Sequence, residues 1–482
     1  MNNELQKFLD QFDNLTTSSK DLNKSSIFVA YPGEKNDGRN FIFQAAQNGA
    51  EAILYDPINY EWNEDCDLPH FAVNNLKNNL SYIADQFYKY PSKKIHITGV
   101  TGTNGKTSCV FWLTQCLSFF KSNTAFIGTI GYGKLRNFSK SLNTTPNALI
   151  TQLILHEFYK AEIENVAMEV SSHGVAQGRV AAINFDVKLF TNLTRDHLDY
   201  HGSIESYAKV KASFMLSSSK GRVVINIDDN LGRLIYKESK LALTRKISYA
   251  IDRDADIKAI NINYMNQFSE FDLLFCNETY HIKAPVIGKF NIYNILGVIG
   301  CLISMGYKIP EIIKSIKNLS SVPGRVEFIT NKSKNMPSVV IDYAHTPDAL
   351  KNILLSLKIL KPKRIILVFG CGGNRDRGKR EEMARVVNNF ADFVIVTSDN
   401  PRDEDPIQIM RDITQHLEVN YVNIEDRADA IDYAINKSGE DDLVLIAGKG
   451  HEEYQEIKGK RNSFSDKKIA KKYLSKKQGV KN

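Results

Sequence analysis

The chain has 482 residues, of which 43% are hydrophobic and 24% charged, with a formal net charge of +7 at pH 7. One hydrophobic core rarely grows this large, so the length predicts two or three domains, and the composition excludes a disordered chain. The charge excess lies in Asp466–Asn482, where seven lysines and one acid carry +6 and leave +1 for the other 465 residues. We expect a solvated terminal helix there and no nucleic-acid partner, since aromatic residues do not alternate with the lysines.

Cysteine usage and hydropathy bear on the compartment. Six scattered cysteines, none in a C-x-x-C pair, fit a reducing compartment better than a disulfide framework or a zinc site. The opening MNNELQKFLDQFDN lacks the basic and then apolar pattern of a secretory signal. No run reaches the roughly 18 apolar residues of a membrane span. We therefore expect a soluble, cytoplasmic protein. Separately, we expect it to be a monomer.

Short apolar runs alternate with helical stretches in the first segment. SIFVAYPG (26–33) and AEAILYD (50–56) are typical of strands, whereas FIFQAAQNGA (41–50) and LSYIADQFYK (80–89) are typical of helices. The polar, proline-containing KYPSKK (89–94) then indicates a linker.

The second segment opens with a strand, KIHITGV (94–100), a glycine-rich loop and a helix at 108–120. The strict phosphate-loop pattern G-x-x-x-x-G-K-[ST] requires glycine at position 100, which is valine here. Glycines in the loop still let the backbone approach phosphate, Lys106 would reach the β/γ-phosphates, and the Thr107 hydroxyl would bind Mg²⁺. The loop predicts a nucleotide without choosing a reaction.

Two further motifs indicate a metal–phosphate site. Glu169 ends the apolar strand NVAMEV (165–170), where a carboxylate can bind a metal ion. TNLTRDHLDYHG (191–202) places two acids and two histidines directly after another strand. A single histidine there would more often be structural, but the combination with Glu169 and Thr107 favours metal binding.

The third segment begins after a break at Pro323-Gly324 and carries four buried-type strands, which are 338–343, 364–370, 392–399 and 442–448. Helical patterns separate them, which predicts a parallel, doubly wound sheet. A polar cluster follows each strand: DYAHTPD, GCGGNRDRGKR, SDNPRDEDP and AGKGHEEYQ. Ligands bind outside the carboxyl ends of such strands, so these clusters predict a binding site.

The chain resembles the Mur ligase family along all three segments, through motifs in the family's order: TGTNGKT, MEVSSH, TNLTRDHLDYHG, GKFNIYN, PGRVE, DYAHTPD and GCGGNRDRGKR. The family's loop has the spacing seen here. The resemblance implies an α/β fold of three domains: a UDP-binding domain at 1–89, a central P-loop ATPase-type domain with a parallel sheet at 90–324, and a Rossmann-like amino-acid-binding domain at 325–482.

The activity implied is that of an ATP-dependent amide ligase of bacterial cell-wall synthesis. ATP would phosphorylate the D-glutamyl carboxylate of UDP-N-acetylmuramoyl-L-alanyl-D-glutamate, and an amine would displace the phosphate. The catalytic residues implied are Lys106, Glu169, His197 and a carbamylated Lys211. Thr107, Glu169, His197 and Lys211 would hold two Mg²⁺ ions. From the sequence alone, Lys211 would be a surface lysine beside Lys209.

The remaining contacts also follow from the resemblance. ATP would contact Gly102, Thr103, Asn104, Gly105, Lys106, Thr107, Ser108, Asn294, Arg325 and Asp342. The UDP-muramoyl dipeptide would contact Thr17, Ser19, Glu34, Lys35, Asn36, Asn143, Thr144, Thr145, Ser171, Gln177 and Arg179. The sequence departs from the family beside Thr17 and Ser19, where Ser18 and Lys20 stand in place of the common Asp and Arg.

The segment DNPR (399–402) favours meso-diaminopimelate over L-lysine as the added amino acid. Diaminopimelate carries an extra carboxylate, which a planar arginine binds with two hydrogen bonds. The implied site comprises Arg375, Asp399, Asn400, Pro401, Arg402, Gly448 and Glu452. A lysine-adding ligase remains an alternative, and less favoured ones are a folylpolyglutamate synthase-like ligase, a P-loop motor and a scaffold without activity.

Overall fold

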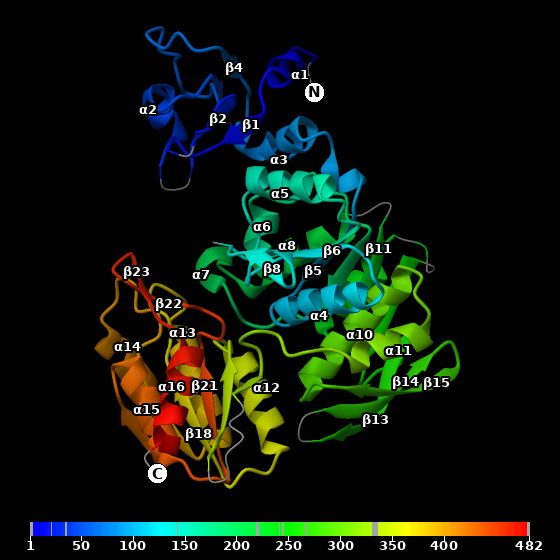
Figure 1. The fold of residues 1–482 in the computed structure, drawn as a ribbon, viewed down its shortest axis with the longest axis vertical. Coiled ribbons are helices and arrows are strands. Elements are labelled where there is room, and N and C mark those ends of the chain that lie inside the picture. The colour runs from blue at the N-terminus through cyan, green and yellow to red at the C-terminus, as the bar shows by residue number, and fades with distance from the viewer. Residues whose placement is uncertain are drawn as a thin grey trace. The chain divides into compact units, whose positions relative to one another are not determined.

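The computed structural model describes residues 3–20, 22–33, 36–141, 143–217, 221–240, 242, 245–265, 268–329 and 336–479. The chain forms two compact units (Figure 1). The first unit comprises Met1–Thr98 and Ser122–Asp186, and the second comprises Gly99–Lys121 and Val187–Asn482. Strand β5 (His96–Thr101) runs from one into the other. The domain boundaries given above stay a prediction. No helix in the described ranges is long and apolar enough to cross a membrane.

The first unit begins with a four-stranded parallel sheet in the order β1-β2-β3-β4. The strands are β1 (Asn14–Thr16), β2 (Ser26–Ala30), β3 (Ala52–Tyr55) and β4 (His70–Ala72). The helices are α1 (Asn3–Leu9), η1 (Gly38–Phe41), α2 (Ile42–Gln47), α3 (Leu76–Phe87) and η2 (Pro91–Lys93). Both inner strands are fully buried, as their continuous apolar runs predict.

The rest of the first unit carries β6 (Thr124–Ile127), β7 (Tyr132–Lys134), β8 (Asn137–Ser139), α5 (Ala148–Lys160), β9 (Asn165–Glu169) and α6 (Ser172–Ala176). Strand β6 pairs in parallel with β9 and antiparallel with β7. Helix α5 starts at the cap Asn147, whose side chain accepts the Ile150 amide, and it packs against α3.

The second unit begins with the phosphate loop and α4 (Lys106–Phe119). It continues with six neighbouring strands of one sheet, β10 to β15. Its elements are β10 (Val187–Phe190), α7 (Leu198–His201), α8 (Ile204–Leu216), β11 (Arg222–Asn226), α9 (Asn230–Glu238), β12 (Lys246–Ala250), β13 (Ile257–Tyr264), β14 (Ser269–Phe275), β15 (Glu278–Ala284), α10 (Lys289–Ser304) and α11 (Ile309–Lys317). Strands β10 to β13 are parallel, and β13 to β15 form an antiparallel meander. Helix α10 is apolar all round because it packs on these strands and on α4.

The same unit ends in a six-stranded sheet of order β16-β17-β21-β18-β19-β20, parallel except for the edge strand β16. The strands are β16 (Glu327–Ile329), β17 (Ser338–Asp342), β18 (Arg364–Phe369), β19 (Phe393–Val396), β20 (Tyr421–Asn423) and β21 (Asp442–Ala447), followed by the hairpin β22 (Tyr454–Ile457) and β23 (Lys460–Ser463). The helices are α12 (Pro347–Lys358), α13 (Gly378–Phe390), α14 (Pro406–Thr414), α15 (Arg427–Lys437) and α16 (Asp466–Gly479).

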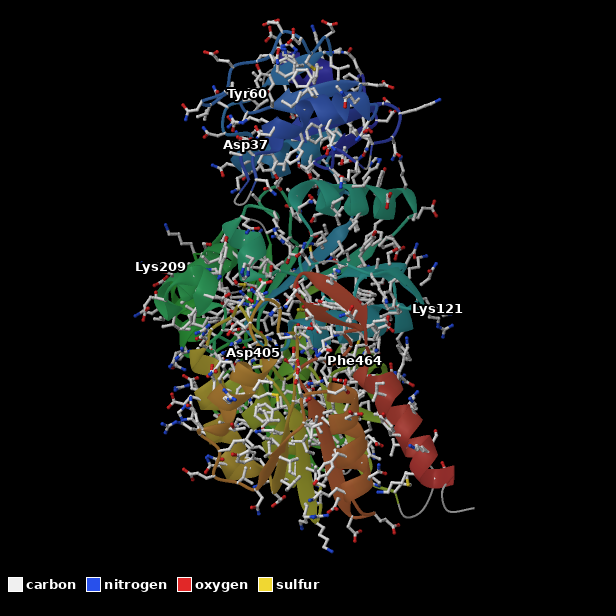
Figure 2. All side chains as sticks on the ribbon, turned by 90° about the vertical axis from the view of Figure 1, so that its left-hand side faces the viewer. Asp37, Tyr60, Lys121, Lys209, Asp405 and Phe464 are labelled. Carbon is white, nitrogen blue, oxygen red and sulfur yellow. The ribbon has the colours of Figure 1, made fainter. Side chains whose placement is uncertain are left out.

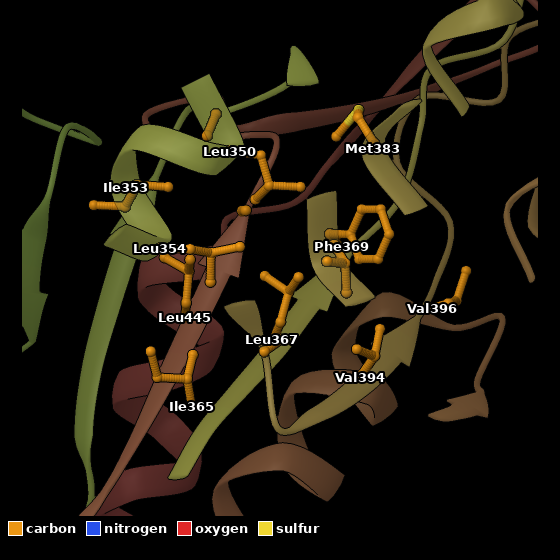
Figure 3. Close-up of a cluster of buried hydrophobic side chains, with 14 of the residues drawn as sticks. Leu350, Ile353, Leu354, Ile365, Leu367, Phe369, Met383, Val394, Val396 and Leu445 are labelled. Carbon is orange, nitrogen blue, oxygen red and sulfur yellow. The ribbon is translucent and has the colours of Figure 1, made fainter. Parts of the chain in front are cut away.

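Apolar clusters cover both faces of this sheet. Figure 3 shows the cluster beneath α12 and α13, where side chains such as Leu354, Phe369 and Leu445 interdigitate. The other face packs against α15 and α16. The four predicted parallel strands are confirmed. The terminal helix is also confirmed, but one side of it is buried against the sheet through Ala470 and Leu474, so it is not solvated all round. The arrangement brings the loops that follow β17, β18, β19 and β21 to one edge of the sheet, as predicted.

Candidate functional site

The phosphate-binding loop joins β5 to α4. Gly102 and Gly105 have φ angles of 152° and 87°, values that favour glycine. A Cβ atom on Gly105 would lie 2.2 Å from Oδ1 of Asn294, so a larger residue would collide with that side chain. Helix α4 begins directly after Gly105, and its first-turn amides form the anion-binding end of a helix.

Asn192, in the loop after β10, holds the phosphate loop in shape. Its carbonyl oxygen accepts the amide of Thr103, and its Oδ1 accepts the amide of Asn104, both at 2.9 Å. The hydroxyl of Thr191 donates to the carbonyl of Asn104 at 2.6 Å. The loop is therefore preorganised by its own neighbours.

Lys106 lies across the loop. Its Nζ donates to the carbonyls of Gly102 and Thr103 at 2.9 and 2.8 Å. Thr107 and Ser108 follow it, both buried in the first turn of α4. The contact of Lys106 with the β/γ-phosphates stays a prediction.

Lys211 is buried, so its surface interpretation is wrong. Its side chain is fully enclosed, and its Nζ donates to the carbonyl of Gly102 at 2.8 Å. Burial, together with the charge of Lys106, lowers the pKa of Lys211 well below its ordinary value. Lys209, two residues earlier on α8, is exposed, and Figure 2 shows it at the edge of the molecule. The helix thus directs one lysine to the loop and the other to solvent.

Tyr207 precedes Lys211 by one helical turn and links it to the loop. The tyrosine is buried, and its hydroxyl lies 3.2 Å from Oγ1 of Thr103. Its ring lies 4.6 Å from Nζ of Lys211 and stacks on His201. The sequence interpretation missed Tyr207, although its i−4 spacing from Lys211 on a helix was a usable signal.

Asp196 is the centre of a buried charge cluster. Its carboxylate accepts from Nζ of Lys379 at 2.9 Å and lies 3.4 Å from Nε2 of His197 and 3.7 Å from Nε2 of His345. Burial alone would raise the pKa of Asp196, but the two histidines and Lys379 lower it well below its usual range. The sequence interpretation noted the acids of this motif without assigning Asp196 a role, and it missed Lys379, which is 183 residues away.

Ion pairs of the same loop extend this cluster towards α13. Arg195 pairs with Asp376 at 3.1 Å and with Glu382 at 2.8 Å. Arg375 lies 3.7 Å from Asp199. The loop after β10 is therefore held against the polar cluster after β18.

Three residues predicted to meet the nucleotide lie outside the phosphate loop, and one of them, Arg325, contacts Thr107. Nη2 of Arg325 donates to the Thr107 hydroxyl at 3.1 Å. Asp342 accepts the amides of Val326 and Ala344 at 2.7 and 2.8 Å, and burial raises its pKa against the opposing effect of Arg325. Asn294 lies behind the loop against Gly105, and its contact with adenine stays a prediction.

An open cavity of about 170 Å³ lies at the carboxyl edge of the C-terminal sheet. Six of the seven residues predicted for the amino acid line it, and Pro401 is the exception: Arg375, Asp399, Asn400, Arg402, Gly448 and Glu452. Asp196, His197 and His345 line it as well. The cavity thus joins the amino-acid cluster to the charge cluster beside the phosphate loop. Cations and carboxylates together suit a ligand that carries both charges.

A hydrogen-bond network fixes the wall of this cavity. Nδ2 of Asn400 donates to Glu452 at 2.9 Å, and the buried Nζ of Lys449 donates to Oδ1 of Asn400 at 3.0 Å and to Glu452 at 2.9 Å. Lys449 was not predicted. Arg402 has a left-handed φ of 51°, and its Nη1 donates to the carbonyl of Gly373 at 2.8 Å. Its guanidinium is thereby held at the cavity.

All described residues predicted for the UDP-muramoyl dipeptide lie in the first unit, and those around Thr145 contact one another. The hydroxyl of Thr145 donates to the carbonyl of Glu169 at 3.0 Å and accepts the amide of Ser171 at 2.9 Å. Arg179 donates to the Thr145 carbonyl at 2.6 Å and to Gln177 at 2.9 Å.

Glu169 is almost fully buried, and its carboxylate accepts the amide of Thr129 at 2.8 Å. The Thr129 hydroxyl lies 3.0 Å from that of Thr144, next to the exposed Asn143. A Cβ atom on Gly128 would lie 2.3 Å from Oε1 of Glu169, so that glycine makes room for the carboxylate.

The uridine-site residues lie elsewhere in the first unit. Ser19 donates to Gln44 at 2.9 Å, whereas Thr17 and Asn36 are exposed. Glu34 and Lys35 lie outside the described residues. The contacts of this group with the substrate stay predictions.

Comparison with known proteins identifies the family. The profile of the Mur ligase middle domain matches residues 100–302, that of the Mur ligase glutamate ligase domain matches 324–450, and that of the Mur ligase family catalytic domain matches 11–88. UDP-N-acetylmuramoyl-L-alanyl-D-glutamate–2,6-diaminopimelate ligase of Pseudomonas syringae pv. tomato is 40% identical over 94% of this chain and 93% of its own. The enzyme of the same name from Fusobacterium nucleatum is 38% identical over 98% of this chain and 96% of its own.

Solved structures of Mur ligases also resemble this chain. A structure of a UDP-N-acetylmuramoyl-L-alanyl-D-glutamate–2,6-diaminopimelate ligase is 31% identical, with a TM-score of 0.67 over 97% of this chain and 95% of that one. The MurF ligase from Thermotoga maritima in complex with ADP is 17% identical, with a TM-score of 0.70 over the whole of both chains, and shares the fold. These matches confirm the α/β class of three domains, with a central P-loop domain and a Rossmann-like C-terminal domain. The chain therefore belongs to the Mur ligase family.

Proposed function

We propose that the protein is an ATP-dependent ligase that adds meso-diaminopimelate to the D-glutamyl carboxylate of UDP-N-acetylmuramoyl-L-alanyl-D-glutamate. The observation that carries this function is the single cavity that six of the seven predicted amino-acid residues line together with Asp196 and His197. Full-length relatives named for this reaction support it. Family membership makes the protein an ATP-dependent, ADP-forming enzyme of peptidoglycan synthesis.

The reaction needs activation of a carboxylate, whose oxygen is a poor leaving group. Transfer of the γ-phosphoryl group of ATP to that oxygen forms an acyl phosphate and ADP. The neutral amine of the amino acid then attacks the acyl carbon, loses a proton and expels phosphate, which leaves an amide bond. Phosphoryl transfer between anions chiefly needs positioning and positive charge. Lys106, the first-turn amides of α4 and Arg325 would supply both at the phosphate loop.

The residues present fit Mg²⁺ if phosphates of the substrates and waters supply the rest of its ligands. The buried hydroxyl of Thr107 offers an oxygen ligand at the first turn of α4, and magnesium bound in this way takes its other ligands from phosphates and waters. Among the described side chains, no group of three or more His, Cys, Asp and Glu residues forms a metal site by itself. Bound magnesium would neutralise charge on the transferring phosphoryl group. Glu169 and His197 as ligands stay predictions.

Carbamylation of Lys211 has support from its surroundings. A neutral amine is the form that attacks CO₂, and burial favours the neutral form of Lys211. Addition of CO₂ to the neutral amine with loss of one proton would convert it into an anion next to the loop. That anion would help to hold the second Mg²⁺.

Arg402 supports diaminopimelate over L-lysine. Its guanidinium lines the cavity, where a carboxylate of diaminopimelate would bind to it. L-lysine would leave that arginine without its partner, which disfavours the smaller substrate. We further propose that the enzyme acts in the cytoplasm as a monomer without nucleic acid.

A ligation assay with mass detection tests the proposal. The purified protein receives ATP, Mg²⁺ and the UDP-muramoyl dipeptide, with meso-diaminopimelate or L-lysine in parallel. Product with diaminopimelate alone supports both the reaction and the role of Arg402. Product chiefly with lysine would keep the reaction and refute the selectivity.

A further inference from the structure

We propose that Arg427 is a positioning residue of the amino-acid cavity and that it couples this cavity to the C-terminal helix α16 through Asp466. The proposal rests on the function proposed above for the cavity. Arg427 begins α15 and Asp466 begins α16, and both side chains are fully buried. A buried pair at the start of two helices needs an explanation, because its charges are costly to remove from water.

Three hydrogen bonds orient the guanidinium of Arg427. Its Nε donates to Oδ1 of Asp466 at 2.8 Å, and its Nη2 donates to Oδ2 of Asp466 at 2.9 Å. Nη2 also donates to the carbonyl of Ala447, the last residue of β21, at 2.9 Å. The planar group is therefore fixed against both a helix start and a strand end.

The free edge of the guanidinium faces the cavity wall. Its Nη1 has no hydrogen-bond partner among the described residues and lies 4.0 Å from Oδ2 of Asp399, which lines the cavity. Asp399 is the first residue of DNPR. The Ala447 carbonyl that Arg427 holds precedes Gly448, another lining residue. Arg427 thus lies behind two adjacent parts of the wall without lining the cavity itself.

Space at this wall is tight. Gly448 has a φ of 116°, and a Cβ atom on it would lie 2.6 Å from Oδ2 of Asp399 and 3.9 Å from Nη2 of Arg427. A small rotation of the guanidinium would therefore move the carboxylate or the Gly448 peptide. The carboxylate of Asp399 suits the amino group of an amino acid, and a fixed cation 4.0 Å behind it holds that carboxylate in place.

This arrangement gives α16 a role beyond covering the sheet. The helix packs beside α15 (Figure 1). It also packs against β16 and β17. Its first residue, Asp466, is the counterion that Arg427 needs, so the position of α16 is transmitted to Asp399 through one guanidinium. A purely structural pair would hold α16 in place and leave amino-acid binding unchanged.

The test replaces both charges at once. In the double variant Arg427→Met/Asp466→Leu, two apolar side chains of similar volume take the place of the ion pair, a change that many proteins tolerate. We expect the apparent KM for diaminopimelate to rise about tenfold or more while the KM for ATP changes by less than about twofold. Arg427→Lys, which keeps a charge and loses the planar fork, should give an intermediate KM for diaminopimelate.

The matched control is Arg364→Met/Asp442→Leu. Arg364 and Asp442 form a 2.6 Å ion pair at the amino ends of β18 and β21, the end of the sheet opposite the cavity. The control variant should change the free energy of unfolding and leave the KM values for ATP and for diaminopimelate unchanged. If the Arg427→Met/Asp466→Leu protein does not fold, Asp466→Asn serves in its place and should raise the KM for diaminopimelate about threefold or more.

An unchanged KM for diaminopimelate in folded Arg427→Met/Asp466→Leu or Asp466→Asn protein would overturn the inference. So would an equal rise for ATP and for diaminopimelate, which would indicate general loosening. Failure of the unmodified enzyme to ligate diaminopimelate at all would instead refute the function proposed above. The two failures are therefore distinguishable.

Discussion

Nζ of Lys211, in the middle of α8, donates a hydrogen bond to the carbonyl of Gly102 in the phosphate loop across 2.8 Å. Lys106 donates to the same carbonyl at 2.9 Å. Two lysines thus converge on one loop oxygen, and one of them is fully buried. Because its buried amine contacts the loop and would carry the carbamate, Lys211 is an informative residue to change.

Lys211→Ala should be nearly inactive, because it removes the group that would carry the carbamate. Short carboxylates such as acetate should restore part of the activity by taking the place of the missing anion. Lys209→Ala is the matched control, since Lys209 is exposed on the same helix and should tolerate the change. Full activity of Lys211→Ala without added carboxylate would refute the role.

Tyr207→Phe should weaken ATP binding and leave the binding of diaminopimelate unaffected. The variant keeps the ring beside Lys211 and loses the hydroxyl that lies 3.2 Å from Thr103, a contact worth about 1 kcal/mol. We expect a rise of about fivefold in the Kd for ATP, measured by titration calorimetry. Tyr200→Phe, which alters a more exposed tyrosine nearby, is the control. Equal Kd values for Tyr207→Phe and the unmodified protein would show that the hydroxyl does not position the loop.

Arg402→Ala should raise the apparent KM for diaminopimelate about tenfold or more and leave that for ATP nearly unchanged. The reason is the loss of the guanidinium that lines the cavity. Arg411→Ala, which removes an exposed arginine of α14, controls for the change in net charge. Equal rises in both KM values for Arg402→Ala would contradict a specific contact with the amino acid.

Asp85→Asn should stabilise the first unit above about pH 6. Burial raises the pKa of Asp85 to about 6, and its Oδ1 has no hydrogen-bond partner within the described part of the chain. Between about pH 4 and 6 the native state retains a proton that the unfolded state releases, so the aspartate lowers stability increasingly as pH rises through this window. We expect the variant to gain about 1 to 3 kcal/mol near pH 8 and nothing near pH 4.

Urea unfolding at both pH values measures this difference. Asp65→Asn, which removes the same charge from an exposed loop, is the control and should show no such pH dependence. A gain for Asp85→Asn that is equal at both pH values would show that the charge of Asp85 is not its cause.

The sequence predicted the strands that are buried on both faces, because the sequence of such a strand is a continuous apolar run. Strands β17, β18, β19 and β21 are fully or nearly fully buried, and each was predicted. The strands β20 and β23 were missed because they are short and mostly exposed, so no apolar run marks them.

The candidate site was predictable where motifs carry it and not where tertiary contacts do. The sequence predicted that Asp399, Arg402 and Glu452 lie near one another, because their polar loops follow strands of one parallel sheet. The pair of Lys379 with Asp196 joins residues 183 positions apart, and only the fold shows that they meet. The burial of Lys211 was likewise hidden, because a lysine on a lysine-containing helix is ordinarily solvated.

The ligation assay with parallel amino acids tests the central claim most directly. The unmodified protein should join UDP-N-acetylmuramoyl-L-alanyl-D-glutamate to diaminopimelate when ATP and Mg²⁺ are present. The mass of the product should equal the sum of these two substrates less one water. One ADP should appear for each product molecule, and L-lysine should give little or none. No product with either amino acid, with ATP hydrolysis only when nucleic acid is added, would contradict the assignment.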